Sequence, residues 1–290
     1  DACGIKAFMG ASTGDMLIDS PDALELLFEH APVMVVTHCE DSPMIWANED
    51  KAREKYGEDV PMSEHPNIRS AEACFKSSSY AIDLATRHDA LLHILHLTTA
   101  AEMDHFSATH RSEKRITAEV CAHHLWFDES RYADLGTRIK CNPAIKTAED
   151  REALIAGLNS GKLDIIATDH APHLQSEKEL EVLSSPCGMV GIECALPRSR
   201  KSRIDTGACD WSQMLAMLTW RPAEIINAQK GSLAVDDRAD IVVIDPDAQW
   251  SIDAKKFYSK SRNCPYQGWN VKGKVLYTLV AGEVRFEAKA

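Results

Sequence analysis

Short apolar runs that are typical of β-strands alternate with longer helical patterns through most of this chain, and this alternation constrains the fold more than any other feature. Five such runs precede residue 170, over residues 5–9, 33–37, 91–97, 116–122 and 163–168. A strand, a helix and a second strand form a right-handed crossover unit, so the five strands are expected to pair in parallel. The pattern predicts an α/β fold, although a closed (β/α)8 barrel needs eight strands.

Apolar spacing and capping residues predict the segments between these runs. Ser20 and Pro21 open one helix, because Ser caps a helix and Pro fits its first turn. Apolar residues at helical spacing predict further helices over 70–88, 149–158 and 211–228, and another near 100–110. The polar segments 41–69 and 170–190 are expected to be long loops, the first with one short helix.

After residue 230 the pattern changes, because strand-like runs follow one another without helices between them. These runs cover residues 239–245, 250–253 and 273–286. Consecutive strands joined by turns indicate a small antiparallel sheet. We therefore expect two domains, a larger parallel unit over residues 1–230 and a small β-rich unit over residues 231–290.

Composition excludes several classes of protein. The chain has 44 acidic and 32 basic residues and a formal net charge of −12, which argues against broad nucleic-acid binding. No apolar run approaches the roughly 18 residues that a membrane span needs. The nine cysteines include no CxxC pair, which argues against a disulfide framework and against a thiolate zinc site. We expect a cytoplasmic protein that binds neither nucleic acid nor a membrane.

Polar side chains lie in or directly after several predicted strands, at the edge where barrel active sites form. They are Lys6, His38, His96, Asp169, His170 and His173. One histidine of this kind is more often structural than a ligand, but imidazole and carboxylate groups at successive strand ends converge on one axis. These are the ligands of a zinc-type catalytic site that keeps one position open for water.

Lys6 does not fit such a site as it stands, because an ammonium group has no lone pair. Burial among apolar neighbours would lower its pKa, and the neutral amine could then react with CO2 to form a carbamate that bridges two metals. Alternatively, Lys6 extends to the surface or pairs with an acid. The residues alone favour this second interpretation.

Six segments of the chain, in this order, resemble the dihydroorotases of the amidohydrolase superfamily: GIKAFMGASTGDML, VVTHCED, LHILHLTTAAE, IKCNPAIKTAEDREAL, DIIATDHAPH and ADIVVID. The resemblance covers essentially the whole chain. It implies a (β/α)8 TIM-barrel metallohydrolase, with residues 1–230 as part of the barrel and residues 231–290 as the C-terminal part of a small β-sandwich. Hydantoinases and allantoinases share the Lys, His, His and Asp positions, so they remain alternatives.

The resemblance also implies roles for individual residues. Lys6 resembles the carboxylated lysine that bridges two Zn²⁺ ions, and His38 and His96 resemble the ligands of the second ion. Asp169 resembles the aspartate that binds the first ion and moves the proton. Substrate contacts are implied for four further residues, Asn142, His173, Cys187 and Gly188, although a Phe is more usual than Cys at position 187.

The implied reaction is the reversible cyclisation of N-carbamoyl-L-aspartate to L-dihydroorotate in pyrimidine biosynthesis. A hydroxide between the metals would attack the ring amide carbonyl, and Asp169 would pass its proton to the leaving nitrogen. The family further implies a homodimer and an association with aspartate transcarbamoylase.

One family motif is missing, because no His-x-His occurs in the 290 residues. In the family this pair ends the first barrel strand and binds the first metal. If Lys6 marks strand 4, the five strands are strands 4 to 8, and about 95 residues of barrel precede them. We therefore expect the sequence to be part of a longer chain. The alternative is a catalytically inactive scaffold partner of aspartate transcarbamoylase.

The adjacent pair His123 and His124 could line the site, but a structural or loop role is expected for them. Five more are expected to be solvated on helices or loops: His30, His65, His88, His105 and His110.

Overall fold

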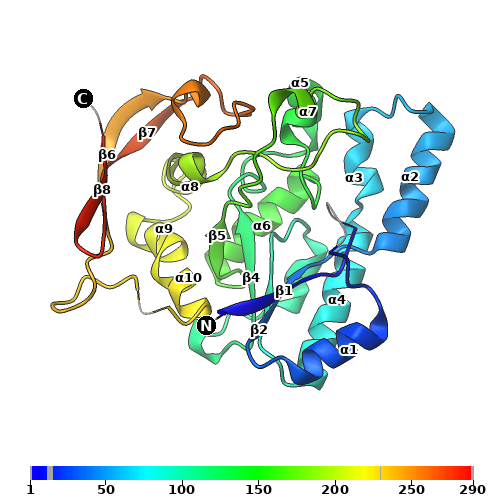
Figure 1. Cartoon of the computed structure of the whole chain (residues 1–290), viewed down its shortest axis with the longest axis horizontal. Helices are drawn as coiled ribbons and strands as arrows, with labels where there is room; N and C mark the ends of the chain where they lie inside the picture. Colours follow the sequence, from blue (N-terminus) through cyan, green and yellow to red (C-terminus); the bar gives the residue numbers. More distant parts are fainter. Residues whose placement is uncertain (1, 12–15, 229, 289–290) are drawn as a thin grey trace.

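A five-stranded parallel sheet forms the centre of the molecule (Figure 1). The computed structural model describes residues 2–11, 16–228 and 230–288. The strands pair in chain order, each parallel to the next, and they are β1 (Gly4–Phe8), β2 (Met34–His38), β3 (Leu92–Ile94), β4 (Ile116–Cys121) and β5 (Ile165–Ala167). The five predicted strands and their parallel order are confirmed.

One face of this sheet packs on three helices, α1 (Pro21–His30), α4 (Ala71–Arg87) and α6 (Ala148–Ser160). The core between them joins Leu24 and Phe28 of α1, Leu84 of α4 and Leu158 of α6 to apolar strand residues such as Val35. Helix α1 follows Ser20 and has Pro21 in its first turn, as predicted, but the Ser20 side chain makes no capping hydrogen bond. Two other helices have side-chain caps. The hydroxyl of Ser70 accepts the amide of Ala73 at 3.3 Å, and Thr147 and Asp150 form a reciprocal capping box.

The opposite face of the sheet is polar apart from a small apolar cluster, in which Met34, Val36 and Ile165 pack with Ile225 of helix α10 (Trp220–Ile225). Side chains alternate along a strand, so the neighbours of the core residues Ala118 and Val120 point the other way. This second face carries Lys6, His38, His93, Thr117, Glu119 and Cys121. Parallel sheets are usually apolar on both faces, so a polar face signals a functional surface.

The predicted loop over 41–69 is wrong, because the 15-residue helix α2 (Ser42–Tyr56) and the short helix α3 (His65–Ile68) lie within it. Asp41 caps the start of α2, where its carboxylate accepts the amide of Met44 at 3.0 Å, and Gly57 caps its end. Only Ser42, Ile45 and Ala52 of this helix are buried. Its apolar stripe is therefore too narrow to stand out in the sequence.

Other helical predictions are partly confirmed. The segment near 100–110 forms only a 3₁₀ turn over Ala101–His105, and the helix over 211–228 divides at Thr219 into α9 (Trp211–Leu218) and α10 (Trp220–Ile225). Three helices occur where no long helix is expected, namely α5 (Tyr132–Leu135), α7 (Gln175–Lys178) and α8 (Ala195–Arg203). In the part of the chain that the structure describes, no helix is long and apolar enough to span a membrane.

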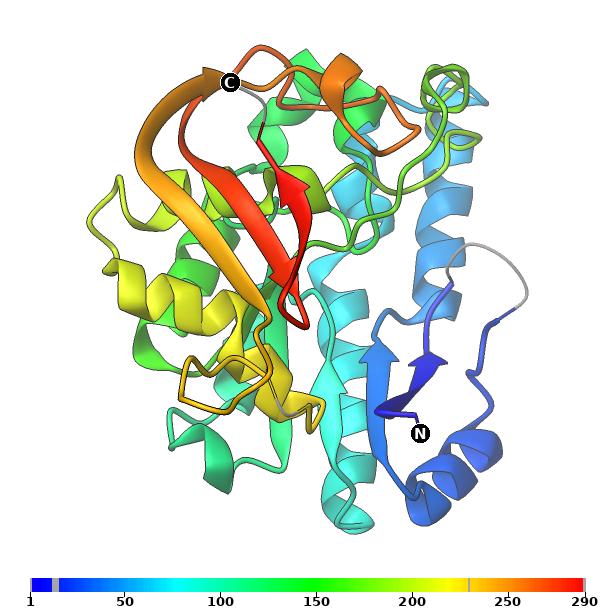
Figure 2. The same ribbon diagram turned by 60° about the vertical axis from the view of Figure 1, so that its left-hand side comes forward.

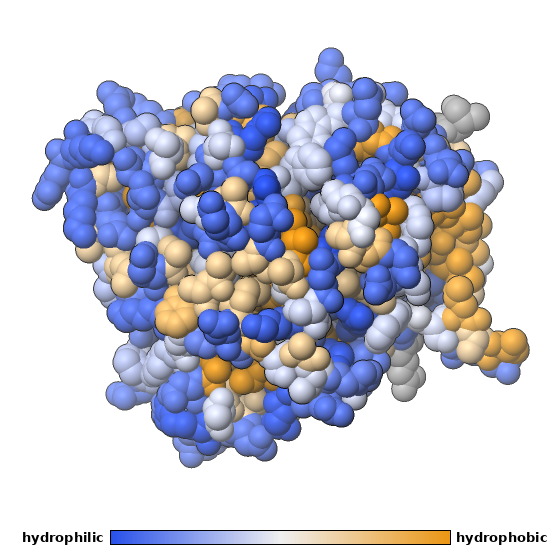
Figure 3. Space-filling model, turned by 180° about the vertical axis from the view of Figure 1, so that it is seen from behind, coloured by the Kyte–Doolittle hydropathy of each residue, from blue (hydrophilic) through white to orange (hydrophobic). Residues whose placement is uncertain are grey.

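A three-stranded antiparallel sheet follows, formed by β6 (Ile241–Ser251), β7 (Asn270–Val280) and β8 (Glu283–Glu287) (Figure 2). The separate strand expected over 250–253 is instead the end of β6. The sheet leaves apolar side chains exposed, including Val242, Val243 and Val284, and an apolar strip marks this side of the surface (Figure 3). The β-sandwich and the domain boundary at residue 230 stay predictions.

A buried ion pair joins β4 and β5 at the end opposite to His38. Lys114 Nζ lies 2.9 Å from Asp164 Oδ1, and Asp164 Oδ2 accepts the amide of Ala118 at 2.9 Å. Both charged side chains are 3% exposed. Removal of one partner would leave the other charge buried without compensation.

We predict that Asp164→Asn lowers the free energy of unfolding by about 3–5 kcal/mol, because it leaves Lys114 buried and unpaired. Urea denaturation of the natural protein measures the effect. The matched control is Asp104→Asn, since the Asp104 side chain is 94% exposed and lies 3.7 Å from Lys162. Equal destabilisation by the two variants would contradict the prediction.

Candidate active site

Two buried imidazoles face each other at the carboxyl edge of the parallel sheet. His38 ends β2, and His96 follows β3 with a left-handed backbone, φ +38°. His38 Nδ1 lies 3.0 Å from His96 Nε2. His38 is 2% exposed and His96 is 4% exposed. The two histidines were expected to bind the same ion, and in the structure their rings lie side by side.

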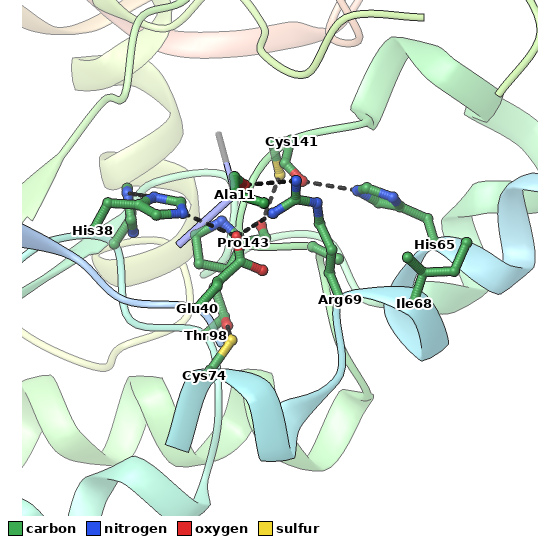
Figure 4. Close-up of polar contacts among 12 residues, drawn as sticks. Ala11, His38, Glu40, His65, Ile68, Arg69, Cys74, Thr98, Cys141 and Pro143 are labelled. Atoms are coloured by element: carbon green, nitrogen blue, oxygen red, sulfur yellow. Dashed lines mark hydrogen bonds and ion pairs between the residues drawn. The ribbon is translucent and has the colours of Figure 1, made fainter. Parts of the chain in front are cut away.

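A buried carboxylate orients His38 (Figure 4). Glu40 Oε2 accepts a hydrogen bond from His38 Nε2 at 3.0 Å and also pairs with the guanidinium of Arg69. A carboxylate only accepts, so His38 carries its proton on Nε2 and directs the Nδ1 lone pair toward His96. Burial alone would raise the pKa of Glu40, but Arg69 and His38 outweigh it and lower that pKa to about 2.

The loop after β1 packs directly on this network. Arg69 donates to the carbonyl oxygen of Ala11 at 2.8 Å. Gly10 lies so close to Glu40 that an added Cβ would collide with the Glu40 backbone. This contact explains the glycine of the KAFMG segment, while Ser12–Asp15 of the same motif lie outside the described residues.

Asp169 comes to the same edge from β5. Its backbone is also left-handed, with φ +40°, and its side chain is half-buried. Burial and the neighbouring His38 lower the pKa of His96 to about 4, whereas the charge of Asp169 acts in the opposite direction. Asp169 therefore lies within electrostatic reach of the histidine pair.

Lys6 is exposed, in contrast to the buried amine that the carbamate argument assumed. Its Nζ lies 4.5 Å from the centre of the Phe8 ring, and that ring lies 6.1 Å from the ring of His38. Lys6 and His38 are thus on the same face of the sheet, with Phe8 between them.

Of the four expected substrate-binding residues, three lie in the loop that follows Asp169, whereas Asn142 lies in another segment. His173 Nε2 lies 3.2 Å from the carbonyl oxygen of Cys187, and Gly188 has φ +138°. A Cβ at Gly188 would lie 2.6 Å from the carbonyl oxygen of Ala171, so only glycine fits. Asn142 precedes a cis proline and leaves its buried Oδ1 without a partner among the described residues.

Two buried lysines hold this loop in place. Lys178 Nζ donates to the carbonyl oxygens of Pro186 at 2.8 Å and Gly188 at 3.0 Å. Lys140 Nζ donates to the carbonyl oxygen of Ser185 at 2.5 Å. Burial lowers the pKa of Lys178 to about 8 and also lowers the pKa of Lys140.

Sequence analysis missed several of these residues. Glu40 is two residues after His38, and this His-x-Glu spacing was the available signal. Arg69 and Lys178 lie in segments expected to be loops, so no pattern pointed to them. The expectation that His65 is solvated is wrong, because it is 3% exposed and its Nε2 lies 2.9 Å from the carbonyl oxygen of Cys141.

The histidine pair is suited to a cation. Metal-binding histidines commonly bond their second ring nitrogen to a carboxylate, as His38 does with Glu40. Glu119 supports the partner, because its Oε1 accepts the backbone amide of His96 at 3.3 Å. His96 Nδ1 is buried without a partner among the described residues. The donor set of imidazole and carboxylate fits a zinc-type ion.

Curated relatives of the chain are named dihydroorotase. The protein from Anaplasma phagocytophilum is 42% identical over 68% of this chain and 44% of its own length. The protein from Staphylococcus aureus (strain Mu50) is 33% identical over 96% of this chain and 64% of its own length. The chain thus spans about half to two thirds of the length of the curated relatives it matches.

Solved structures share the fold at low identity. The L-hydantoinase (dihydropyrimidinase) from Arthrobacter aurescens has a TM-score of 0.91 at 23% identity, over 98% of this chain and 65% of that one. The dihydropyrimidinase from Brevibacillus agri has a TM-score of 0.88 at 22% identity, over 97% and 63%. These matches confirm the predicted α/β barrel class. The model of the amidohydrolase family matches residues 15–285, and the chain therefore belongs to the amidohydrolase family.

Proposed function

We propose that this chain carries the catalytic part of a dihydroorotase, which interconverts N-carbamoyl-L-aspartate and L-dihydroorotate. The observation that carries the proposal is the facing pair of buried imidazoles, His38 and His96, with Asp169 beside them. The names of relatives at 33–42% identity support this substrate over a hydantoin. The structures named hydantoinase are only 18–23% identical and support the fold alone.

Zn²⁺ would be held by His38 and His96, with Asp169 and a carboxylated Lys6 as further ligands of a two-ion site. When bound, the ions would polarise an amide carbonyl and lower the pKa of a water molecule. Lys6 would have to become a carbamate for this role, and its exposed position does not provide the burial that favours a neutral amine. Glu40 would keep His38 in the tautomer that offers Nδ1 to the ion.

Asp169 would move the proton in both directions of the reaction. It would accept a proton from the attacking water and deliver it to the leaving ring nitrogen, or the reverse during ring closure. The half-buried position of Asp169 beside His96 suits a group that must both meet substrate and exchange protons.

The loop that Lys178 and Lys140 hold in place would bind the substrate. His173 would meet the substrate carboxylate, the backbone at Cys187 and Gly188 would meet the ring, and Asn142 would contact the carbamoyl part. The unpartnered Oδ1 of Asn142 supports this role, because a buried amide oxygen without a donor is costly unless a ligand supplies one. A homodimer, an association with aspartate transcarbamoylase and a cytoplasmic location stay predictions.

We predict that Glu40→Gln weakens Zn²⁺ binding by about 10–100-fold, because His38 loses the carboxylate that fixes its tautomer. A competition titration with a chromophoric chelator measures the affinity. His38→Ala should abolish this site altogether. Glu49→Gln is the control, since Glu49 pairs with Arg53 on the surface of α2 and should leave the affinity unchanged. Unaltered binding in Glu40→Gln would contradict the assignment.

We predict that Asp169→Asn lowers the turnover of dihydroorotate by about 10²–10⁴-fold, because the amide cannot carry the proton. Some metal should stay bound. Steady-state assays of the full natural polypeptide, with elemental analysis of bound metal, measure both quantities. A rate like that of the unmodified enzyme would disprove the role of Asp169. Parallel assays with hydantoin and allantoin test the substrate, and activity on hydantoin but not dihydroorotate would overturn the proposed function.

A further inference from the structure

A second cluster of potential metal ligands lies at the end of β4 and shares no residue with the proposed active site. It consists of Cys121, His123 and His124, whose donor atoms all lie within 4.8 Å of one another. Cys121 and His123 are 0% exposed and His124 is 3% exposed. The cluster is therefore enclosed by protein.

The local backbone explains why these three side chains meet. Strand β4 ends at Cys121, and the chain turns at once, because the amide of His124 donates to the carbonyl oxygen of Cys121 at 2.9 Å. This turn brings residues 121 and 124 to the same side. The rings of His123 and His124 have centres 4.2 Å apart.

The hydrogen bonding of the two imidazoles is incomplete. Neither ring nitrogen of His123 has a partner among the described residues, and the same holds for His124 Nδ1. Buried polar atoms are rarely left in this state, since each lost hydrogen bond costs free energy. Three such atoms beside one thiol indicate that a further group belongs there.

His124 has the arrangement expected of a metal ligand. Its Nε2 lies 3.2 Å from the carbonyl oxygen of Pro143, and a carbonyl only accepts, so Nε2 carries the proton. The Nδ1 lone pair is then free and buried. A backbone carbonyl on the second ring nitrogen is a common way to fix the tautomer of a metal-binding histidine.

The charge states of the side chains narrow the kind of ion. Burial lowers the pKa of His124 to about 3 and that of His123 well below its usual range, so both rings are neutral and can donate lone pairs. Burial raises the pKa of the Cys121 thiol, so an ion must displace a proton from sulfur. Soft or borderline ions such as Zn²⁺ do this, whereas Mg²⁺ and Ca²⁺ prefer oxygen ligands.

We propose that Cys121, His123 and His124 bind a thiophilic divalent cation of the Zn²⁺ class, with a ligand set that shares no residue with the pair of His38 and His96. One thiolate and two imidazoles form a known ligand set for Zn²⁺, with the fourth position filled by water or by another donor. The absence of CxxC pairs from the sequence does not exclude this site, because its ligands follow a Cys-x-His-His pattern. It requires no assumption about the reaction that the protein catalyses.

Cobalt substitution tests the proposal, because only a thiolate ligand gives an intense near-ultraviolet charge-transfer band. The proposed catalytic ligands include no sulfur. The full natural protein, stripped with a chelator and loaded with Co²⁺, should show this band, and Cys121→Ser should abolish it. Cys74→Ser is the control, because Cys74 is a buried thiol on α4 whose loss should leave the band intact.

X-ray absorption of the unmodified, Zn²⁺-loaded protein keeps the test decisive if a variant fails to fold. It should detect a sulfur ligand at about 2.3 Å from zinc. Absence of sulfur around the metal, or a charge-transfer band that persists in Cys121→Ser, would overturn the proposal. A band that is present in the unmodified protein and lost in Cys121→Ser, together with absent dihydroorotase activity of the unmodified, Zn²⁺-loaded protein, would refute the proposed function and leave this site standing.

Discussion

The buried carboxylate of Glu40 is the group on which the arrangement of the site depends. A charge enclosed in protein is stable only when it is paired and hydrogen-bonded, and Glu40 has both Arg69 and His38 for this purpose. The pairing ties α3 and the loop after β1 to the end of β2. It also determines which nitrogen of His38 faces His96. The geometry of the candidate site and the local stability thus rest on the same carboxylate.

Much of the fold could be predicted from the sequence because buried parallel strands are short, apolar and rich in β-branched residues. Helix α2 escaped prediction for the opposite reason, since only three of its residues are buried and its stability rests on caps and surface pairs such as Glu49 with Arg53. The polar residues at the strand ends could be identified because each lies in an apolar run or directly after one. Arg69 and Lys178 were not, because a side chain that reaches the site from a distant segment leaves no spacing signal.

Shared architecture alone leaves the choice of substrate open in this family. Proteins named dihydropyrimidinase or hydantoinase have nearly the same backbone at 18–23% identity. Three of the four proposed substrate-binding residues lie in the segment from His173 to Gly188. Apart from the four-residue helix α7, the segment is held by the ammonium groups of Lys140 and Lys178, which bind its backbone carbonyls.

The ion pair of Lys114 and Asp164 lies at the opposite end of the strands from the histidines. The ion pair joins the amino-terminal ends of β4 and β5, whereas the residues of the candidate site lie at the carboxyl-terminal ends of the strands. Stability and site chemistry are thus separated in space: a substitution near Asp164 would act on the folded sheet, whereas a substitution in the loops near Asp169 would act on the candidate site.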